Sequence, residues 1–222
     1  MAVTIMLTQQ RREKEKEQRR NLILDAAQTL FFSKNYSEIT IEEIADKAQL
    51  AKGTLYTYFK SKEALYSAVA LRGAHIMNEM FKDAADRNQS GLEKAFAIGQ
   101  AYYEFYKRHP HYFHVLVEAE NLPVARSDDI NAAELIRVSC ENLETVLNAV
   151  VTGIKDGSIK PDLNPQQTSI FLIQSTRAMI LLPPGFEIFL RRADADRDAT
   201  VKFTLRALRG SIENIQTKKI GD

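Results

Sequence analysis

Residues 40–62 read TIEEIADKAQLAKGTLYTYFKSK, and this stretch decides how the chain begins to fold. Thr40 and, three residues later, Glu43 form a capping box, which is the signature of a helix start. The apolar positions that follow share one helical face, and they are Ile41, Ile44, Ala45 and Ala48. A short amphipathic helix is therefore predicted, ending at a tight turn over residues 49–51.

A second short helix is predicted after this turn. Leu55 and Phe59 lie one helical turn apart and point to the same core as the first helix. The other side chains are left largely outward, and they are Lys52, Gly53, Thr54, Tyr56 and Thr57. A cation, a glycine, hydroxyls and a tyrosine suit a surface that lies on the phosphates and base edges of DNA. The spacing thus predicts a helix-turn-helix, with the second helix as the recognition helix.

The same stretch resembles the DNA-binding domain of TetR-type (tetracycline-repressor-like, AcrR-like) bacterial transcriptional regulators. Their pattern is roughly T-x-x-x-I-A-x-x-A-G-V-S-x-G-x-L-Y-x-Y-F-x-x-K-x-x-L. The matching positions are Thr40, Ile44, Ala45, Ala48, Gly53, Leu55, Tyr56, Tyr58, Phe59, Lys62 and Leu65. A match over about ten fixed positions is far more specific than a lone short motif.

Two positions depart from the family pattern. Gln49 stands where the family usually has glycine, and a non-glycine residue in a left-handed turn costs about 1 kcal/mol. Ala51 stands where a serine or threonine usually caps the recognition helix, and the lost cap forgoes about 0.5–2 kcal/mol of stability. We therefore expect that Gln49 bears this strain or that the turn has a different shape, and that the recognition helix is uncapped.

The resemblance implies which residues contact DNA. Gly53 would let the helix backbone approach the duplex closely, and Lys52 and Thr54 would reach base edges or phosphates. Tyr58 lies between the outward and inward faces, so phosphate contact and packing against the first helix both stay open. The predicted DNA-binding set is Thr40, Lys52, Gly53, Thr54, Tyr56, Thr57, Tyr58, Lys60 and Lys62.

The composition adds little about the partner. A formal net charge of +1 over 222 residues does not by itself indicate nucleic-acid binding. The charge is uneven, because residues 9–20 hold six Lys or Arg against three Glu. This segment favours attraction to phosphates, and a solvated helix start explains it equally well.

Cysteine usage and hydropathy indicate the compartment. Cys140 is the only cysteine, which excludes an intramolecular disulfide and fits a reducing environment. Charges follow the mildly apolar N-terminus rather than precede it, so a signal peptide is not expected. No apolar run approaches the ~18 residues that a membrane-spanning helix needs. We therefore expect a soluble, cytoplasmic protein.

The rest of the chain shows helical periodicity and no convincing strand. Helices are expected near residues 10–34, 62–87, 91–108, 112–120, 136–154, 165–182 and 194–216, with a frayed N-terminus and a loop over residues 121–128. The predicted fold is all-α with about nine helices. Residues 1–66 are expected to form an N-terminal arm and the helix-turn-helix domain, and residues 67–222 a helical effector-binding and dimerisation domain.

An aromatic and methionine-rich set in this second domain suggests a pocket. TetR-like proteins usually bind a small effector among these helices, so the resemblance implies one here. An ordinary hydrophobic core explains such a set as well, although the tyrosine hydroxyls need partners when buried and so favour a cavity. The candidate pocket residues are Met77, Met80, Phe81, Phe96, Tyr102, Tyr103, Tyr106, Tyr112, Phe113 and Met179.

Two apolar seams have heptad-like spacing, which suits near-parallel helix packing. The first consists of Ile136, Cys140, Leu143, Leu147, Val150 and Ile154, so Cys140 is expected to be buried. The second consists of Val201, Leu205, Leu208, Ile212 and Ile215. The resemblance implies a four-helix dimer interface, and its predicted contacts are Phe171, Ser175, Val201, Leu205, Leu208 and Ile212.

Enzymatic and metal chemistry find little support. The sequence has no Gly-rich phosphate loop, no H-E-x-x-H and no nucleophile elbow, so the protein is not expected to be an enzyme. His109, His111 and His114 are close in sequence, but no cysteine or carboxylate clearly completes a ligand set, so no metal or cofactor is predicted and the question stays open.

The sequence therefore predicts a DNA-binding transcriptional regulator. The expected form is a homodimeric repressor, released from a pseudo-palindromic operator by a small, partly apolar effector. An alternative is a regulator that is constitutive or gated by a protein partner, and a distant one is a helical enzyme with an inherited DNA-binding domain. The operator, the effector, the pathway and the direction of regulation are not encoded in these patterns.

Overall fold

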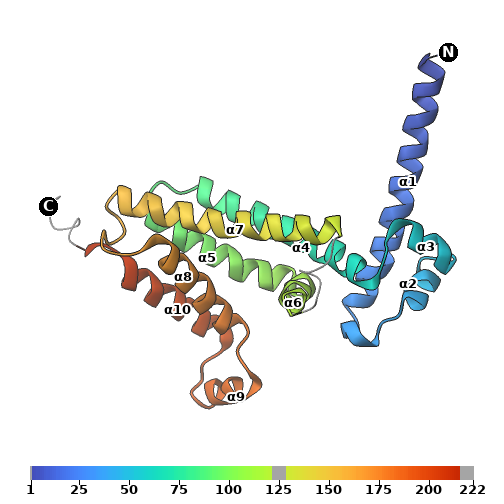
Figure 1. Cartoon of the computed structure of the whole chain (residues 1–222). Coiled ribbons are helices and arrows are strands. Elements are labelled where there is room, and N and C mark those ends of the chain that lie inside the picture. Colours follow the sequence, from blue (N-terminus) through green and yellow to red (C-terminus); the bar gives the residue numbers. More distant parts are fainter. Residues whose placement is uncertain (1, 122–128, 216–222) are drawn as a thin grey trace. The chain divides into compact units, whose positions relative to one another are not determined.

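The computed structural model describes residues 2–121 and 129–215, with side chains from residue 9 onward, and these residues form an all-α fold (Figure 1). Its helices are α1 (Ala2–Phe31), α2 (Ile41–Lys47), α3 (Lys52–Tyr58), α4 (Lys62–Asp86), α5 (Gly91–Arg108), α6 (Pro110–Ala119), α7 (Ile130–Lys155), α8 (Pro165–Ile180), α9 (Pro184–Arg192) and α10 (Arg197–Ile212), with a 3₁₀ turn at Tyr36–Glu38. Within the described residues an isolated bridge joins Ile159 to Glu213 and no strand forms. The predicted fold class is confirmed. Most of the predicted loop after residue 121 lies outside the described residues.

Helix α9 is additional to the predicted set. No helix is predicted between residues 182 and 194, where Pro183-Pro184-Gly185 ends the preceding helix, yet Pro183 is the N-cap of α9 and Pro184 opens its first turn. A proline at the first helical position loses no hydrogen bond, because that N–H group has no partner within the helix anyway. The same residues therefore end one helix and begin the next.

Helix α1 also begins earlier than predicted, at Ala2 instead of near residue 10. Every residue from 9 to 19 is exposed, so this part of α1 is a charged helix in contact with solvent on all sides. Pairs one turn apart support it, including Arg11 Nε with Glu15 Oε1 at 2.9 Å and Asn21 Nδ2 with Glu17 Oε1 at 3.2 Å.

The chain forms two compact units, and each is described by itself. The first comprises Met1–Ala74 and His111–Arg137, and the second comprises His75–Pro110 and Val138–Asp222. Packing thus divides α4 between Ala74 and His75. The predicted boundary after residue 66 was drawn between a DNA-binding and an effector-binding function and not between packed units. It stays a prediction.

The first unit has a core that the helix-turn-helix shares with its neighbours. Side chains from α1, α2, α3 and α4 are buried together, and they include Ile23, Ala27, Phe31, Ile44, Ala45, Leu55, Leu65 and Val69. Aromatic rings extend this core, with Phe31 and Tyr66 edge to face at 4.8 Å between centroids. This packing holds α2 and α3 at a fixed angle.

The second unit packs α5, α8 and α10 against one another and brings α5 against α7. The backbones of α5 and α7 nearly touch where two glycines meet, since a Cβ on Gly91 would lie 2.3 Å from the Cα of Gly153. Asp156 strengthens this junction by accepting hydrogen bonds from the N–H groups of Gly91 and Ser158 at 2.7 and 2.9 Å.

The predicted seam of α7 coincides with its buried face at Val150 and Ile154, but the first part of the seam is displaced from that face. Ile136, Cys140 and Leu143 are exposed, whereas the buried face carries Val138, Asn142, Val146 and Ala149. The expectation that Cys140 is buried was wrong. The buried face holds an asparagine and small residues, so the large apolar side chains beside it gave the stronger but misleading pattern.

Candidate nucleic-acid interface and effector cavity

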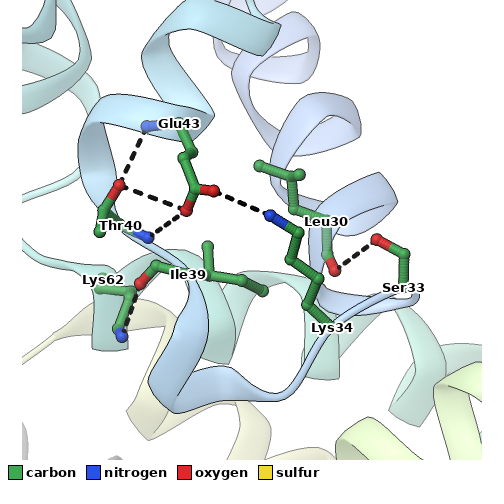
Figure 2. Close-up of polar contacts among 7 residues, drawn as sticks. All are labelled: Leu30, Ser33, Lys34, Ile39, Thr40, Glu43 and Lys62. Atoms are coloured by element: carbon green, nitrogen blue, oxygen red, sulfur yellow. Dashed lines mark hydrogen bonds and ion pairs between the residues drawn. The ribbon is translucent and has the colours of Figure 1, made fainter.

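The start of α2 is fixed by a network of polar contacts, shown in Figure 2. Thr40 Oγ1 accepts from the Glu43 N–H at 3.2 Å, and Glu43 Oε2 accepts from the Thr40 N–H at 2.9 Å. The predicted capping box is thus confirmed. The other oxygen of Glu43 accepts from Lys34 Nζ at 2.8 Å, which ties α2 to the end of α1. The bond from Lys34 holds the pKa of the Glu43 carboxyl below its usual range.

The turn between α2 and α3 has the hydrogen bonds of a Schellman motif. The N–H of Leu50 bonds the carbonyl of Ala45 at 2.9 Å, and the N–H of Gln49 bonds that of Asp46 at 3.0 Å. Gln49 has φ of 56°, in the left-handed region that favours glycine. Of the two alternatives, the structure therefore has the left-handed turn in which Gln49 bears the strain.

Recognition helix α3 begins without a side-chain cap, because Ala51 occupies the N-cap position and makes no side-chain bond. The helix is anchored instead by Leu55 and Phe59, both buried as predicted. Gly53 is exposed, and a Cβ built on it would meet nothing within 4 Å. Its φ is not positive, so neither packing nor backbone conformation within the chain calls for a glycine there.

The predicted DNA-reading side chains differ in how free they are. Tyr56, Thr57 and Lys60 are exposed, although the Thr57 hydroxyl donates to the Thr54 carbonyl at 2.6 Å. Lys52 Nζ forms an ion pair with Glu42, and this bond holds the pKa of the Glu42 carboxyl below its usual range. Contact with DNA would therefore draw Lys52 away from an existing partner.

Lys62 is held inside the first unit. Its ammonium donates to the carbonyls of Tyr36 and Ile39 at 2.8 and 2.9 Å, and it lies 4.0 Å from the centroid of the Tyr36 ring. These bonds close the segment before α2 onto the start of α4, so Lys62 has a structural task. Its predicted phosphate contact stays a prediction.

Tyr58 is half-buried and lines an open groove between α1 and the turn before α3. Residues of α1 line the same groove, so packing against α1 and contact with a phosphate both stay open for Tyr58. Thr40 has its hydroxyl in the capping box, and Thr54 is half-buried. The predicted set thus gathers around α3, and its contacts with DNA stay predictions.

A small apolar cavity lies within the second unit. Its volume is about 30 Å³, enough for a water molecule or two. It is lined by Phe81, Leu92, Ala95, Phe96, Ile98, Gly99, Tyr102, Val146, Leu172, Ile173, Thr176, Leu205, Leu208, Arg209 and Ile212. Only Phe81, Phe96 and Tyr102 come from the predicted pocket set, while Met77 packs against the core cluster beside them.

Most other predicted pocket residues lie elsewhere. Tyr112 donates to Gln28 Oε1 at 2.7 Å and Phe113 is buried, both in the first unit. In the second unit Tyr103 stacks on Tyr106, and burial together with the carboxylate of Asp198 raises the pKa of Tyr103 to about 12. Met80 and Met179 are partly buried and do not line the cavity. Sequence spacing identified apolar faces without showing which of them enclose a space.

Arg209 is the one charged side chain that lines the cavity. Its guanidinium lies 5.3 Å from the centroid of the Phe96 ring, and its Nε lies 3.9 Å from a carboxylate oxygen of Glu213. It gives the otherwise apolar wall one cationic point. Nothing in the sequence pattern singled it out, because an arginine on an amphipathic helix usually faces solvent.

Four of the six residues predicted to form the dimer interface are not available to a partner chain. Val201, Leu205, Leu208 and Ile212 are buried within the single chain, so they have no free surface to offer a partner. Phe171 is 49% exposed and Ser175 is half-buried. Large apolar side chains that do face outward on α8, α9 and α10 are Ile170, Phe171, Phe186, Ile188, Phe189 and Phe203.

Metal and membrane sites find no support in the part of the chain that the structure describes. His109, His111 and His114 do not belong to any group of three or more residues able to hold a metal ion, because none was found over residues 2–121 and 129–215. None of the helices in those ranges has both the length and the apolarity to cross a membrane.

Comparison with known proteins agrees with this geometry. Residues 23–69 match the family of bacterial regulatory proteins described as the tetR family. The chain is 28% identical over 209 residues to the HTH-type transcriptional repressor DhaR of Mycobacterium sp. (strain GP1), covering 90% of this chain and 96% of DhaR. It is 27% identical over 159 residues to the HTH-type transcriptional repressor KstR2 of Mycolicibacterium smegmatis, covering 71% and 76% of the two chains.

Solved structures show the same fold. The ketosteroid transcriptional regulator KstR2 of Mycobacterium tuberculosis superposes with a TM-score of 0.65 at 21% identity, covering 88% of this chain and 95% of that one. The regulator FadR from Bacillus subtilis, solved in complex with stearoyl-CoA, superposes with a TM-score of 0.64 at 18% identity, covering 84% and 96%.

Proposed function

Because this chain belongs to the TetR family of bacterial transcriptional regulators, we propose that it is a homodimeric repressor that a small, partly apolar effector releases from a pseudo-palindromic operator. The observation that carries the DNA-binding part is Gly53. A glycine in a helix interior costs about 0.5–1 kcal/mol relative to alanine, and nothing within the chain requires it. Close approach of a duplex to α3 accounts for this residue.

The dimer follows from exposed apolar side chains. Ile170 and Phe171 on α8 and Phe203 on α10 are between 49% and 65% exposed, and α8 and α10 pack on each other within the chain. An outward apolar patch of this kind marks an interaction site in a folded protein. We propose that a second copy packs on this face, and operator binding by the dimer then requires its two recognition helices to enter successive major grooves, about 34–36 Å apart.

A gel shift with DNA from upstream of the gene tests the operator. We expect a shift that depends on a palindromic sequence and weakens steeply between 50 and 200 mM salt, since phosphate contacts release counterions. A scrambled half-site is the matched control. Equal binding to both duplexes at every salt concentration would contradict sequence-specific recognition.

The effector site is proposed for the cavity of the second unit. Its wall is apolar except for Arg209 and the polar groups of Tyr102 and Thr176. The related regulators point the same way, since FadR was solved with stearoyl-CoA and KstR2 is named a ketosteroid regulator. An apolar molecule with an anionic or polar group fits this wall and Arg209.

The cavity is too small, as it stands, to hold an effector of this kind. Pockets for drug-sized ligands have volumes of about 300–1,000 Å³, far above the 30 Å³ seen here, so binding must open the second unit. An effector that binds only the opened form shifts the population toward it, and about 5.5 kcal/mol of preference gives a nearly complete switch. Release from DNA would be coupled to this opening.

Thermal-shift assays with a fatty acid, an acyl-CoA and a steroid test the effector. A ligand at 100 times its Kd stabilises the folded state by about 2.7 kcal/mol, and the same ligand should abolish the gel shift. Gly99→Val is the control, because a Cβ at Gly99 would already lie 2.8 Å from Leu205 Cδ2 and the larger side chain fills the cavity. The variant should bind DNA and no longer respond.

A regulator without a small effector is the second candidate, and the small cavity is the observation that favours it. In that form the second unit is a solid core, and the protein is constitutive or gated by a protein partner. Stability and DNA binding that no ligand class changes would support it. The related proteins are named as regulators, which leaves the alternative of a helical enzyme without support.

A further inference from the structure

The N-terminal half of α1 has a groove beside it that the proposed role of α3 does not use. The groove has a volume of about 640 Å³ and lies entirely within the first unit. It is lined by Arg12, Glu15, Lys16, Gln18, Arg19 and Leu22 from α1, by Ala48, Gln49 and Leu50 from the turn, and by Tyr58 from α3. One wall therefore belongs to α1 and the other to the helix-turn-helix.

The α1 wall carries three cations on one face. Arg12, Lys16 and Arg19 follow the i, i+4, i+7 spacing of a single helical stripe. All three are exposed, and none of them makes an ion pair or hydrogen bond within the described residues. The one acidic side chain of the groove, Glu15, is already bound to Arg11 at 2.9 Å. Three cations and one carboxylate thus line the groove, which gives it a net positive charge.

Arg20, the next cation along α1, shows the contrast. It is partly buried, its guanidinium donates to Asn131 Oδ1 at 2.9 Å, and it lies 5.0 Å from the centroid of the Phe59 ring. That arginine serves the packing of the first unit. Arg12, Lys16 and Arg19 have no such task, although they lie within three turns of it.

The opposite wall joins this groove to the recognition helix. Tyr58 is the last residue of α3, and Gln49 is in the turn that precedes it. The side chains of both carry neutral hydrogen-bond donors of the kind that contact DNA phosphates. The three cations span about 10.5 Å along α1, while successive phosphates of one strand advance by about 3.4 Å along the duplex axis. With α1 placed along the duplex axis, the stripe is therefore long enough for about three phosphates.

We propose that this groove is a second DNA site, which seats the sugar–phosphate backbone of the operator beside the major groove entered by α3. The inference rests on the proposed operator binding and adds to it a sequence-independent contact made by α1. It also accounts for residues 9–19 of α1, about three turns that are exposed on every side, because their partner is the duplex.

The salt dependence of operator affinity tests this site. The variant carrying Arg12→Gln, Lys16→Gln and Arg19→Gln should lower the slope of log K against log salt by about 0.9 per lost contact, or about 2.7 per protomer. Between 50 and 200 mM salt the wild-type protein should then lose about 40-fold more affinity per protomer than the variant. Circular dichroism should show the same helix content in both.

Two lysines on the same helix provide a matched control. Lys16→Gln and Lys14→Gln remove the same charge two residues apart, but only Lys16 lines the groove. We expect the Lys16 variant to lower the slope and the Lys14 variant to leave it unchanged. Equal effects would show diffuse attraction by α1 and overturn the proposal, as would an unchanged slope in the triple variant.

Failure of the broader function gives a different result. If the wild-type protein shows no palindrome-dependent binding, operator recognition itself fails, whatever the groove does. If the triple variant keeps the full DNA slope but loses binding to phosphatidylglycerol vesicles that the wild-type protein binds, the groove belongs to a lipid surface. That outcome would also overturn the proposal while leaving operator binding intact.

Discussion

The two helices of the helix-turn-helix, α2 and α3, differ in how their N-termini are capped. Helix α2 has a complete capping box, and Glu43 of that box is bonded to Lys34 at the end of α1. Helix α3 follows a left-handed Gln49 and has Ala51 at its N-cap, so no side chain supports its start. Contacts within the chain fix α2, whereas α3 depends on Leu55 and Phe59 beneath it. The helix that holds the domain is optimised for stability, and the helix proposed to read DNA is not.

Substitution of Gly53 should have the largest effect on this contrast. Gly53→Ala should raise the free energy of unfolding by about 0.5–1 kcal/mol, because alanine favours a helix. Operator affinity should fall by about 5- to 150-fold, since a lost base contact costs about 1–3 kcal/mol. Urea denaturation and gel shift on the same sample measure the two effects. A variant that is more stable and binds DNA unchanged would remove the reason for a glycine in α3.

Removal of the cap of α2 should come next in size. Thr40→Ala breaks the bond to the Glu43 N–H and should lower the free energy of unfolding by about 0.5–2 kcal/mol. Thr40→Ser retains the hydroxyl and serves as the control. The midpoint of urea denaturation should fall for alanine and stay close to wild type for serine. Equal midpoints for all three proteins would show that the box contributes nothing.

Addition of a cap to α3 should give a similar change with the opposite sign. Ala51→Ser places a hydroxyl at an N-cap whose backbone is already extended, with φ of −65° and ψ of 142°. The melting temperature should rise, corresponding to about 0.5–2 kcal/mol. Ala51→Val, which adds bulk without a hydroxyl, is the comparison. A melting temperature for the serine variant at or below that of wild type would contradict the cap argument.

The pH dependence of α2 should be the smallest effect. The hydrogen bond from Lys34 holds the pKa of Glu43 below its usual value of 4.5 in the folded state. A lowered folded pKa gives stability that is present above the unfolded value and lost as the pH falls through the folded one. Wild-type protein should therefore lose stability below about pH 4.5 more steeply than Glu43→Gln. Parallel stability curves for the two proteins would exclude this contribution.

The structure of the helix-turn-helix could be predicted closely, because the sequence features that determine it are local. Thr40 with Glu43, the departures at Gln49 and Ala51, and the burial of Leu55 and Phe59 each depend on neighbours in sequence. The second unit was harder, because an apolar stripe shows that a helix face is buried without showing which surface covers it. Val201, Leu205, Leu208 and Ile212 were assigned to a partner chain and instead lie buried in the protomer. The last three line its cavity.

Other differences have equally specific causes. Proline is compatible with both a helix end and a helix start, so α9 was missed at Pro183-Pro184-Gly185. Asn142 occupies the buried face of α7, where its Oδ1 accepts from Asn78 Nδ2 at 2.9 Å. This polar residue interrupts the apolar spacing from which a buried helix face is predicted. The cavity lining depends on contacts among five helices, which no single stretch of sequence records.

The ion pair between Lys52 and Glu42 bears on how the protein searches long DNA for its operator. If Lys52 contacts base edges as proposed, it would keep Glu42 as its partner on a random sequence, where no base edge matches it. At the operator it would exchange this carboxylate for a base edge. The ion pair would then weaken binding to non-specific DNA more than binding to the operator, and so shorten the residence time on non-specific DNA.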